Sequence, residues 1–371
     1  MSLLLTGAQS LIPVSVLTGF LGSGKTSLLN RLVQMPGMNR VLVIINEFGE
    51  IGLDHDLIAR TSEDLVVEMM GGCLCCTIRG DLLATLRDAP WRFARDGLCW
   101  FDRVLIETTG LADPAPILHT LMTDSHLTSL YRLDGVITTV DAATGMATLD
   151  RQDEAVKQAA MADRLLLTKT DLVMAAEENA LRARLADINP AAPVISVLHG
   201  EVDPTHLFDA GVYDPRSKSE DVQNWLQAEA YEHGHHHHHG HAHDVNRHGD
   251  RIHATCLTFD TPLDAESFER WLDLLMRIRG ADLLRVKGII HLAGEERPAV
   301  IHGVQHVFHP PVLLDAWPSQ DRRSRIVFIT RDISGDDLRA MLPLMAGPTP
   351  SQDRNGLLGS SPRAGLFTAS M

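Results

Sequence analysis

The sequence is short of basic residues, with 33 lysines and arginines against 48 aspartates and glutamates among 371 residues. The net charge of −15, with histidine neutral, argues against a general nucleic-acid binder and against a protein that binds anionic membranes. Long apolar runs are also missing, which argues against a membrane-spanning helix. Residues 1–17 have neither a basic region nor a small-residue cleavage site. We therefore expect no signal peptide and a cytoplasmic location.

Cysteine is scarce as well, and its distribution is uneven. The chain has five cysteines, and three of them fall within four successive positions. An odd number gathered in one cluster does not make a disulfide framework, so we expect reduced thiols. The five are Cys73, Cys75, Cys76, Cys99 and Cys256.

Short apolar runs alternate with helical segments over about the first 200 residues. Continuous apolar runs are typical of strands that are covered on both faces. The alternation predicts an α/β fold with a mostly parallel sheet, whose functional groups lie at the carboxyl ends of the strands. The expected strands are 14–18, 40–46, 64–70, 103–107, 135–140, 164–167 and 193–197, and the expected helices are 27–35, 81–87 and 177–186.

Composition divides the chain into four predicted parts. A P-loop nucleotide-binding domain at 1–211 is followed by a polar linker at 212–250, which contains nine of the 19 histidines and would bind divalent ions weakly. A smaller α+β domain is expected at 251–346, and a disordered tail at 347–371. The smaller domain should contain strands at 252–259, 283–290, 298–304 and 324–330, with helices at 264–276 and 334–345.

The segment GFLGSGKT at 19–26 fits the phosphate-loop pattern G-x-x-x-x-G-K-[ST], with a strand expected before it and a helix after it. Glycines let backbone N–H groups close around phosphates, and the helix N-terminus adds partial positive charge. Lys25 would reach the β and γ phosphates, and the Thr26 hydroxyl would bind Mg²⁺. The predicted nucleotide-binding residues are Gly19, Gly22, Ser23, Gly24, Lys25, Thr26 and Ser27.

Two later strand ends also carry polar motifs. The segment 168–171, TKTD, could bind guanine if Asp171 accepts from two N–H groups of the base edge, a pattern that adenine lacks. Together with the phosphate loop, this motif, which includes Thr168 and Lys169, favours GTP over ATP, although a plain strand-end turn is the alternative. Glu107, followed by TTG, could orient a Mg²⁺-bound water, and Gly110 could let the backbone approach the γ-phosphate. The alternative for Glu107 is a purely structural role as a cap at the strand end.

The cysteine cluster offers three thiolates, which suit Zn²⁺, Co²⁺ or Cu⁺. In an extended segment Cys73 and Cys75 point to the same side, and Cys76 joins them only if the chain turns there. A tetrahedral ion needs a fourth ligand, which could be water, Glu47, Glu50 or a partner's residue. The alternatives are small buried hydrophobic side chains or a redox pair.

Taken together, these motifs resemble the CobW family of metallochaperone GTPases. The resemblance rests on GFLGSGKT (19–26), NEFGEIGLD (46–54), GGCLCC (71–76), ETTG (107–110), TKTD (168–171), the His-rich linker and LLRVKGII (283–290). It implies a P-loop GTPase domain, a Cys-x-Cys-Cys metal site, Mg²⁺-dependent GTP hydrolysis and delivery of zinc or cobalt to a client metalloprotein. The guanine motif begins with Thr168, where many GTPases have asparagine.

The hypothesis that follows is a GTP-controlled metal chaperone with slow, metal-stimulated hydrolysis, because no certain arginine finger is present. GTP and Mg²⁺ would order residues 46–56 and tighten the metal, and hydrolysis would loosen it. Zinc is the first choice of metal, and a cobalt chaperone for cobalamin synthesis or for a cobalt enzyme is the second. A GTP-gated metal buffer, and a nucleotide-dependent enzyme with structural cysteines, are the alternatives. The client and any homo-oligomer are left open.

Overall fold

The computed structural model describes residues 11–47, 66–70, 76–208 and 251–346, with side chains in these ranges except at 46–47, 66–70, 76–79 and 346. The described elements form two compact units, which are considered separately. The expected domain boundary at 211, the His-rich linker and the tail lie outside the described residues.

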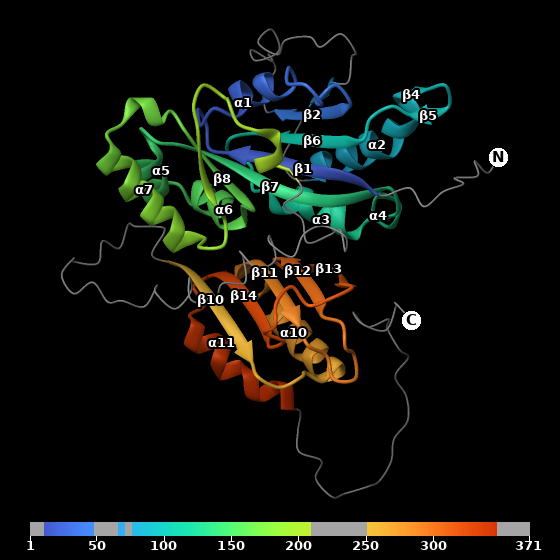
Figure 1. The fold of residues 1–371 in the computed structure, drawn as a ribbon, viewed down its shortest axis with the longest axis vertical. Helices are drawn as coiled ribbons and strands as arrows, with labels where there is room; N and C mark the ends of the chain where they lie inside the picture. The colour runs from blue at the N-terminus through green and yellow to red at the C-terminus, as the bar shows by residue number, and fades with distance from the viewer. Residues whose placement is uncertain (1–10, 48–65, 71–75, 209–250, 347–371) are drawn as a thin grey trace, which may run out of the picture. The chain divides into compact units, whose positions relative to one another are not determined.

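The first unit is built on a seven-stranded sheet with the strand order β3-β2-β6-β1-β7-β8-β9 (Figure 1). All six pairings between neighbouring strands are parallel, which confirms the predicted α/β fold. Its central strands are almost wholly buried, as their continuous apolar runs predict. The strands are β1 (Ile12–Gly19), β2 (Val41–Glu47), β3 (Val66–Met70), β6 (Arg103–Thr108), β7 (Tyr131–Asp141), β8 (Arg164–Thr168) and β9 (Val194–Val197).

The parallel register brings four strand ends to one edge of this sheet. The central strand β1 ends at Gly19, where it is paired with Thr139 of β7. On its other side β1 is paired with β6, so that Leu17 lies beside Glu107. Strand β8 follows β7 in the sheet, with Thr168 beside Asp141. The phosphate loop, Glu107 and the predicted guanine motif therefore start from neighbouring strands.

The helices of this chain region differ more from expectation than the strands do. Helix α2 (Cys76–Arg92) begins five residues before the predicted 81–87. The prediction misses this part because Thr77, Ile78 and Gly80 are weak helix formers. Helix α3 (Ala115–Thr123) is not predicted, because seven of its nine residues are buried and no polar stripe marks it. The remaining helices are α1 (Lys25–Leu32), α4 (Ser125–Leu130), α5 (Gly145–Arg151), α6 (Asp153–Met161) and α7 (Ala175–Ile188), with a short hairpin of β4 (Ala94–Arg95) and β5 (Leu98–Cys99).

Helix α2, which begins at the last cysteine of the cluster, is linked to the sheet by a buried hydrogen bond. It contains Pro90, which has no N–H group for the carbonyl of Leu86 one turn earlier. The hydroxyl of Tyr131, at the start of β7, donates to that carbonyl over 2.8 Å. Burial raises the pKa of Tyr131, so the hydroxyl keeps its proton and remains a donor. A long-range bond thus replaces the one that proline removes.

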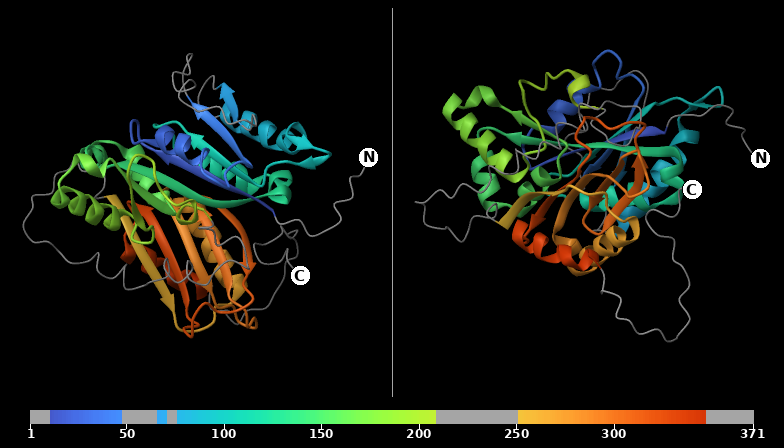
Figure 2. Two further views of the ribbon diagram at one scale, coloured as in Figure 1. Left: turned by 45° about the horizontal axis from the view of Figure 1, so that its top comes forward. Right: turned by 60° about the horizontal axis from the view of Figure 1, so that its bottom comes forward.

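The second unit is a five-stranded antiparallel sheet with the order β10-β14-β11-β12-β13, and two helices accompany it (Figure 2). Helix α10 buries Phe268, Trp271, Leu272 and Leu275 at helical spacing, and these pack in one core with Val286 and Phe328 of the sheet. The smaller α+β fold is confirmed. The bounds are β10 (Ile252–Phe259), α10 (Ala265–Arg279), β11 (Leu283–Ile290), β12 (Ala299–Val304), β13 (Val307–Leu313), β14 (Ser324–Arg331) and α11 (Gly335–Met341).

The expected number of four strands in this unit is wrong, because β13 is a fifth. Its sequence, VFHPPVL, contains Pro310 and Pro311, and proline within a run argues against a strand. The structure tolerates both prolines because β13 lies at the edge of the sheet, where a missing N–H group interrupts only one ladder.

None of the helices in the described ranges combines the length and the apolar character that crossing a membrane requires.

Candidate functional site

A cavity of about 340 Å³ opens at the carboxyl edge of the parallel sheet. It brings together eight residues that the sequence predicts as functional: Gly22, Gly24, Lys25, Thr26, Ser27, Glu107, Gly110 and Lys169. Four further residues line it, namely Leu21, Ile45, Thr108 and Thr109. The phosphate loop and the Glu107 strand therefore share one cavity.

The phosphate loop has the backbone shape that its glycines allow. Gly19 has a φ of +140°, and a Cβ atom there would lie 2.2 Å from the hydroxyl oxygen of Thr139 on β7. Gly24 has a φ of +92° and immediately precedes α1, which begins at Lys25. The loop thus passes from a buried strand directly into a helix N-terminus, an arrangement that suits phosphate groups.

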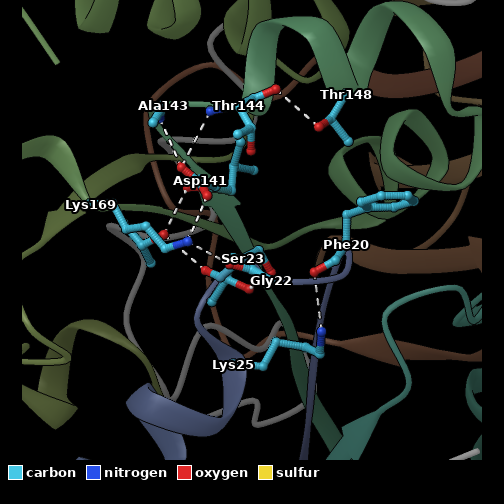
Figure 3. Close-up of polar contacts among 12 residues, drawn as sticks. Phe20, Gly22, Ser23, Lys25, Asp141, Ala143, Thr144, Thr148 and Lys169 are labelled. Carbon is cyan, nitrogen blue, oxygen red and sulfur yellow. Dashed lines mark hydrogen bonds and ion pairs between the residues drawn. The ribbon is translucent and has the colours of Figure 1, made fainter. Parts of the chain in front are cut away.

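The side chain of Lys25 folds back over the loop that carries it. Its Nζ atom donates to the carbonyl oxygen of Gly19 at 2.8 Å. It also donates to the carbonyl oxygen of Phe20 at 3.2 Å (Figure 3). Only 8% of Lys25 is exposed, yet it lines the cavity. The ammonium group is thereby held at the entrance of the loop, where its charge can act on a bound phosphate.

Thr26 and Glu107 meet although they are 81 residues apart in the chain. The Thr26 hydroxyl donates to Oε1 of Glu107 over 3.3 Å, and Glu107 is 7% exposed. A hydroxyl and a carboxylate oxygen side by side in a cavity fit Mg²⁺, which binds oxygen ligands almost exclusively. Thr26 is the residue that would hold this ion with the phosphates of a nucleotide, and Glu107 beside it would orient a water.

The predicted guanine motif lies against the phosphate loop. The Thr168 hydroxyl donates to the carbonyl oxygen of Ser23 over 2.8 Å. Lys169 Nζ donates to the carbonyl oxygen of Gly22 over 2.8 Å (Figure 3). Lys169 lines the cavity, whereas Asp171 is exposed on a short 3₁₀ turn (Thr170–Leu172) and does not line it. Asp171 is therefore positioned next to the cavity and not inside it.

Gly110 contacts the phosphate loop. A Cβ atom at this position would lie 2.6 Å from the backbone nitrogen and 2.8 Å from the Cα atom of Leu21. Both are backbone atoms, so a side chain could be accommodated only if the loop shifted. The sequence predicts a close approach to the γ-phosphate at Gly110, and the structure adds a close approach to the loop that would hold the phosphate.

We expect Gly110→Ala to weaken nucleotide binding by about 5- to 150-fold, because displacement of a preformed loop costs on the order of 1–3 kcal/mol. Gly80→Ala is the matched control: Gly80 lies in α2 with open space around its Cβ position, so alanine should raise helix stability slightly. Equilibrium titration with a fluorescent GDP analogue would measure the nucleotide affinity of both variants. Equal affinity of Gly110→Ala and the native chain would contradict the tight contact.

The predicted metal ligands are only partly covered by the description. Cys73 and Cys75 lie outside the described residues, and so does the side chain of Glu47. Cys76 is the first residue of α2, but its side chain also lies outside the described residues. Within the described ranges, no group of three His, Cys, Asp or Glu side chains could hold a metal ion. Neither Cys99 nor Cys256 forms a disulfide.

Some residues of the site carry no predicted role. Asp141 ends β7 and binds Lys169, and Thr139 two residues earlier forms a 2.7 Å hydroxyl–hydroxyl hydrogen bond with Ser23. A polar side chain at the carboxyl end of a parallel strand is the signal that could identify them. Leu21 offers no such signal, since it lies in the variable part of the loop pattern.

Comparison with known proteins agrees with this geometry. Residues 13–196 match the family model "CobW/HypB/UreG, nucleotide-binding domain", and residues 252–344 match "Cobalamin synthesis protein cobW C-terminal domain". The zinc chaperone YjiA of Escherichia coli is 33% identical over 89% of this chain and 97% of its own length.

Two further similarities concern one fungal relative and one solved structure. The zinc-regulated GTPase metalloprotein activator 1 of Schizosaccharomyces pombe is 34% identical over 56% of this chain and 51% of its own length. The crystal structure of zinc-bound YjiA GTPase from E. coli superimposes with a TM-score of 0.62, at 30% identity, over 90% of this chain and 99% of that one. The chain therefore belongs to the CobW family of P-loop GTPases.

Proposed function

We propose that this GTPase is a zinc chaperone, which binds Zn²⁺ at Cys73, Cys75 and Cys76 and delivers it to a client metalloprotein under the control of GTP. Relatives named zinc chaperone and zinc-regulated metalloprotein activator support zinc as the cargo. Three thiolates also suit zinc by their softness.

The single observation that carries the proposal is the order of strands at the edge of the cavity. Strand β2 lies between β3 and β6, and Glu107 of β6 lines the cavity. Met70, the last residue of β3, is paired with Glu47, the last residue of β2. The cysteine run that follows Met70 and the segment that follows Glu47 thus begin within two strands of Glu107. This adjacency supports a direct coupling between nucleotide and metal.

The same pairing supports Glu47 as the fourth zinc ligand. Zinc in proteins is commonly tetrahedral, and a carboxylate is an accepted ligand beside thiolates. Glu47 lies at the end of β2 and also belongs to residues 46–56, the segment expected to respond to the γ-phosphate. As a zinc ligand it would couple the metal to that segment. Loss of that phosphate would then remove or loosen one ligand and lower the affinity for zinc.

Within the nucleotide site each side chain has a distinct task. Lys25 would bind the β and γ phosphates, and Asp171 would accept from the guanine edge. Glu107 would accept hydrogen bonds from the attacking water and orient it towards the γ-phosphate. A Mg²⁺ ion held beside Thr26 and Glu107 would supply positive charge to the phosphates. No arginine lines the described part of the cavity, which supports slow intrinsic hydrolysis.

The coupling is tested by the zinc affinity in three states: without nucleotide, with Mg-GDP, and with Mg and a non-hydrolysable GTP analogue. A chromophoric zinc chelator that competes with the protein gives each dissociation constant. We expect the GTP-analogue state to bind zinc about 5- to 150-fold more tightly than the GDP state, the usual range for allosteric coupling. Zinc should tighten binding of the analogue by the same factor, because linkage is reciprocal.

Equal zinc affinities in the GDP and GTP-analogue states would refute the coupling. The same titrations with Co²⁺ distinguish the metals, since a cobalt chaperone would favour Co²⁺ in the GTP state. Stoichiometry distinguishes a buffer, which would take up several ions per chain through its histidines with no dependence on nucleotide.

A further inference from the structure

The buried carboxylate of Asp141 lies behind the guanine motif and has no task in the proposed mechanism. It is the last residue of β7 and 8% exposed. Its Oδ1 atom accepts from the backbone N–H groups of Ala143, at 2.8 Å, and Thr144, at 3.3 Å, while Oδ2 accepts from Lys169 Nζ over 2.7 Å (Figure 3). Both oxygens are therefore engaged, and the turn after β7 fixes the carboxylate in place.

Lys169 is the residue that this carboxylate holds. Its backbone adopts the left-handed conformation, with φ 55° and ψ 34°, which is unfavourable for a residue with a side chain. Its ammonium group bridges Asp141 Oδ2 and the carbonyl oxygen of Gly22. Thr168 beside it is bonded to the carbonyl of Ser23. Two successive residues of the guanine motif are thus anchored to the phosphate loop, and Asp141 supplies the negative partner for the strained one.

We propose that Asp141 is a positioning residue for base selection, which acts through Lys169 to hold Asp171 in place for the guanine edge. This inference rests on the proposed use of Asp171 to recognise guanine. Asp141 does not line the described cavity, whereas Lys169 does, so the carboxylate acts on the nucleotide only indirectly. Charged hydrogen bonds are the stronger and shorter class, which suits a contact that must hold a strained backbone.

A purely structural role would look different. If Asp141 served only the turn after β7, its acceptor Oδ1 would matter and its charge would not. Asp141→Asn separates the two roles, because the amide oxygen can still accept from Ala143 and Thr144 while the negative charge facing Lys169 is lost. Asp141→Ala removes both.

The test measures the affinities for GDP, IDP and ADP by displacement of a fluorescent GDP analogue. IDP lacks the 2-amino group, so the GDP-to-IDP affinity ratio reports how well Asp171 meets the guanine edge. We expect this ratio to be about 10 in the native chain, and to fall at least about threefold in Asp141→Asn. The double variant with Lys169→Met should match Lys169→Met alone, because both changes break one pathway.

Asp163→Asn is the matched control. Asp163 is also buried and accepts from a backbone N–H group, that of Val136, over 2.8 Å, so the same chemical change there should leave the ratio unaltered. Thermal unfolding would verify that each variant is folded, and Asp141→Asn carries the test if Asp141→Ala does not fold.

Three results would overturn the inference. A native GDP-to-IDP ratio in Asp141→Asn, or additive effects of Asp141→Asn and Lys169→Met, would refute Asp141 as a positioning residue and leave guanine recognition by Asp171 intact. Equal binding of GDP, IDP and ADP by the native chain would refute guanine recognition itself, and the inference with it.

Discussion

Replacement of Glu107 by glutamine is expected to slow GTP hydrolysis by about 10²- to 10⁴-fold, the range typical for loss of a general acid or base in the transition state. The amide keeps the size of the side chain and can still accept from Thr26, whose hydroxyl lies 3.3 Å from Oε1. It loses the negative charge that would polarise and orient the attacking water. The measurement is single-turnover phosphate release at saturating GTP, because the observed rate then reports the chemical step and does not depend on GTP affinity.

The matched control for this variant is Glu201→Gln. Glu201 is exposed, pairs with Arg31 and does not line the nucleotide cavity. The hydrolysis rate of the Glu201→Gln variant should therefore remain native. The affinity for GTP in Glu107→Gln should fall less than the rate does, because most of the phosphate contacts come from the loop. A rate within about twofold of native would leave Glu107 as no more than a cap at the end of β6.

The joint substitution of Cys73, Cys75 and Cys76 by serine is expected to weaken zinc binding by at least about 10³-fold, because thiolate ligation supplies most of the free energy of such sites. Basal GTP hydrolysis should remain, since Lys25, Thr26 and Glu107 are untouched. The stimulation of hydrolysis by zinc should disappear. Competition with a chromophoric chelator gives the affinity, and phosphate release with and without zinc gives the stimulation.

The chain supplies its own control for this experiment. Cys99 and Cys256 form no disulfide, so serine at both positions makes a comparable chemical change without touching the cluster. A variant without residues 233–243 removes the weak background of the histidines. Native zinc affinity after loss of all three clustered cysteines would contradict the site. Equal hydrolysis with and without zinc, in the native chain as well as in the variant, would favour an enzyme in which these cysteines are structural.

The parallel strands and the phosphate loop could be predicted from the sequence because each produces a local signal. Residues buried on both faces make continuous apolar runs, and the loop has a fixed spacing of glycines, lysine and threonine. Helix α3 has no such signal, since burial on nearly all sides removes its polar stripe. Strand β13 is hidden by two prolines that only an edge position permits.

Prediction from local sequence signals is limited in the same way at the candidate site. Lys25, Thr26 and Glu107 are predictable one by one, but the contact between Thr26 and Glu107 depends on the strand order, which no local pattern encodes. Asp141 was identifiable only as a strand end, because its partner Lys169 lies 28 residues further along the chain. Gly110 has a predicted role at the phosphate, while its contact with Leu21 arises from the packing of two loops.

The bond between Tyr131 and Leu86 has a consequence for how this sequence can evolve. If Tyr131 changes first, the buried Leu86 carbonyl loses the donor that Pro90 cannot replace, at a cost of about 1–3 kcal/mol. If Pro90 changes first, the helix regains its own N–H donor, and the tyrosine hydroxyl becomes dispensable. The two positions are therefore epistatic, and the mutational path between the two solutions is open in one order only.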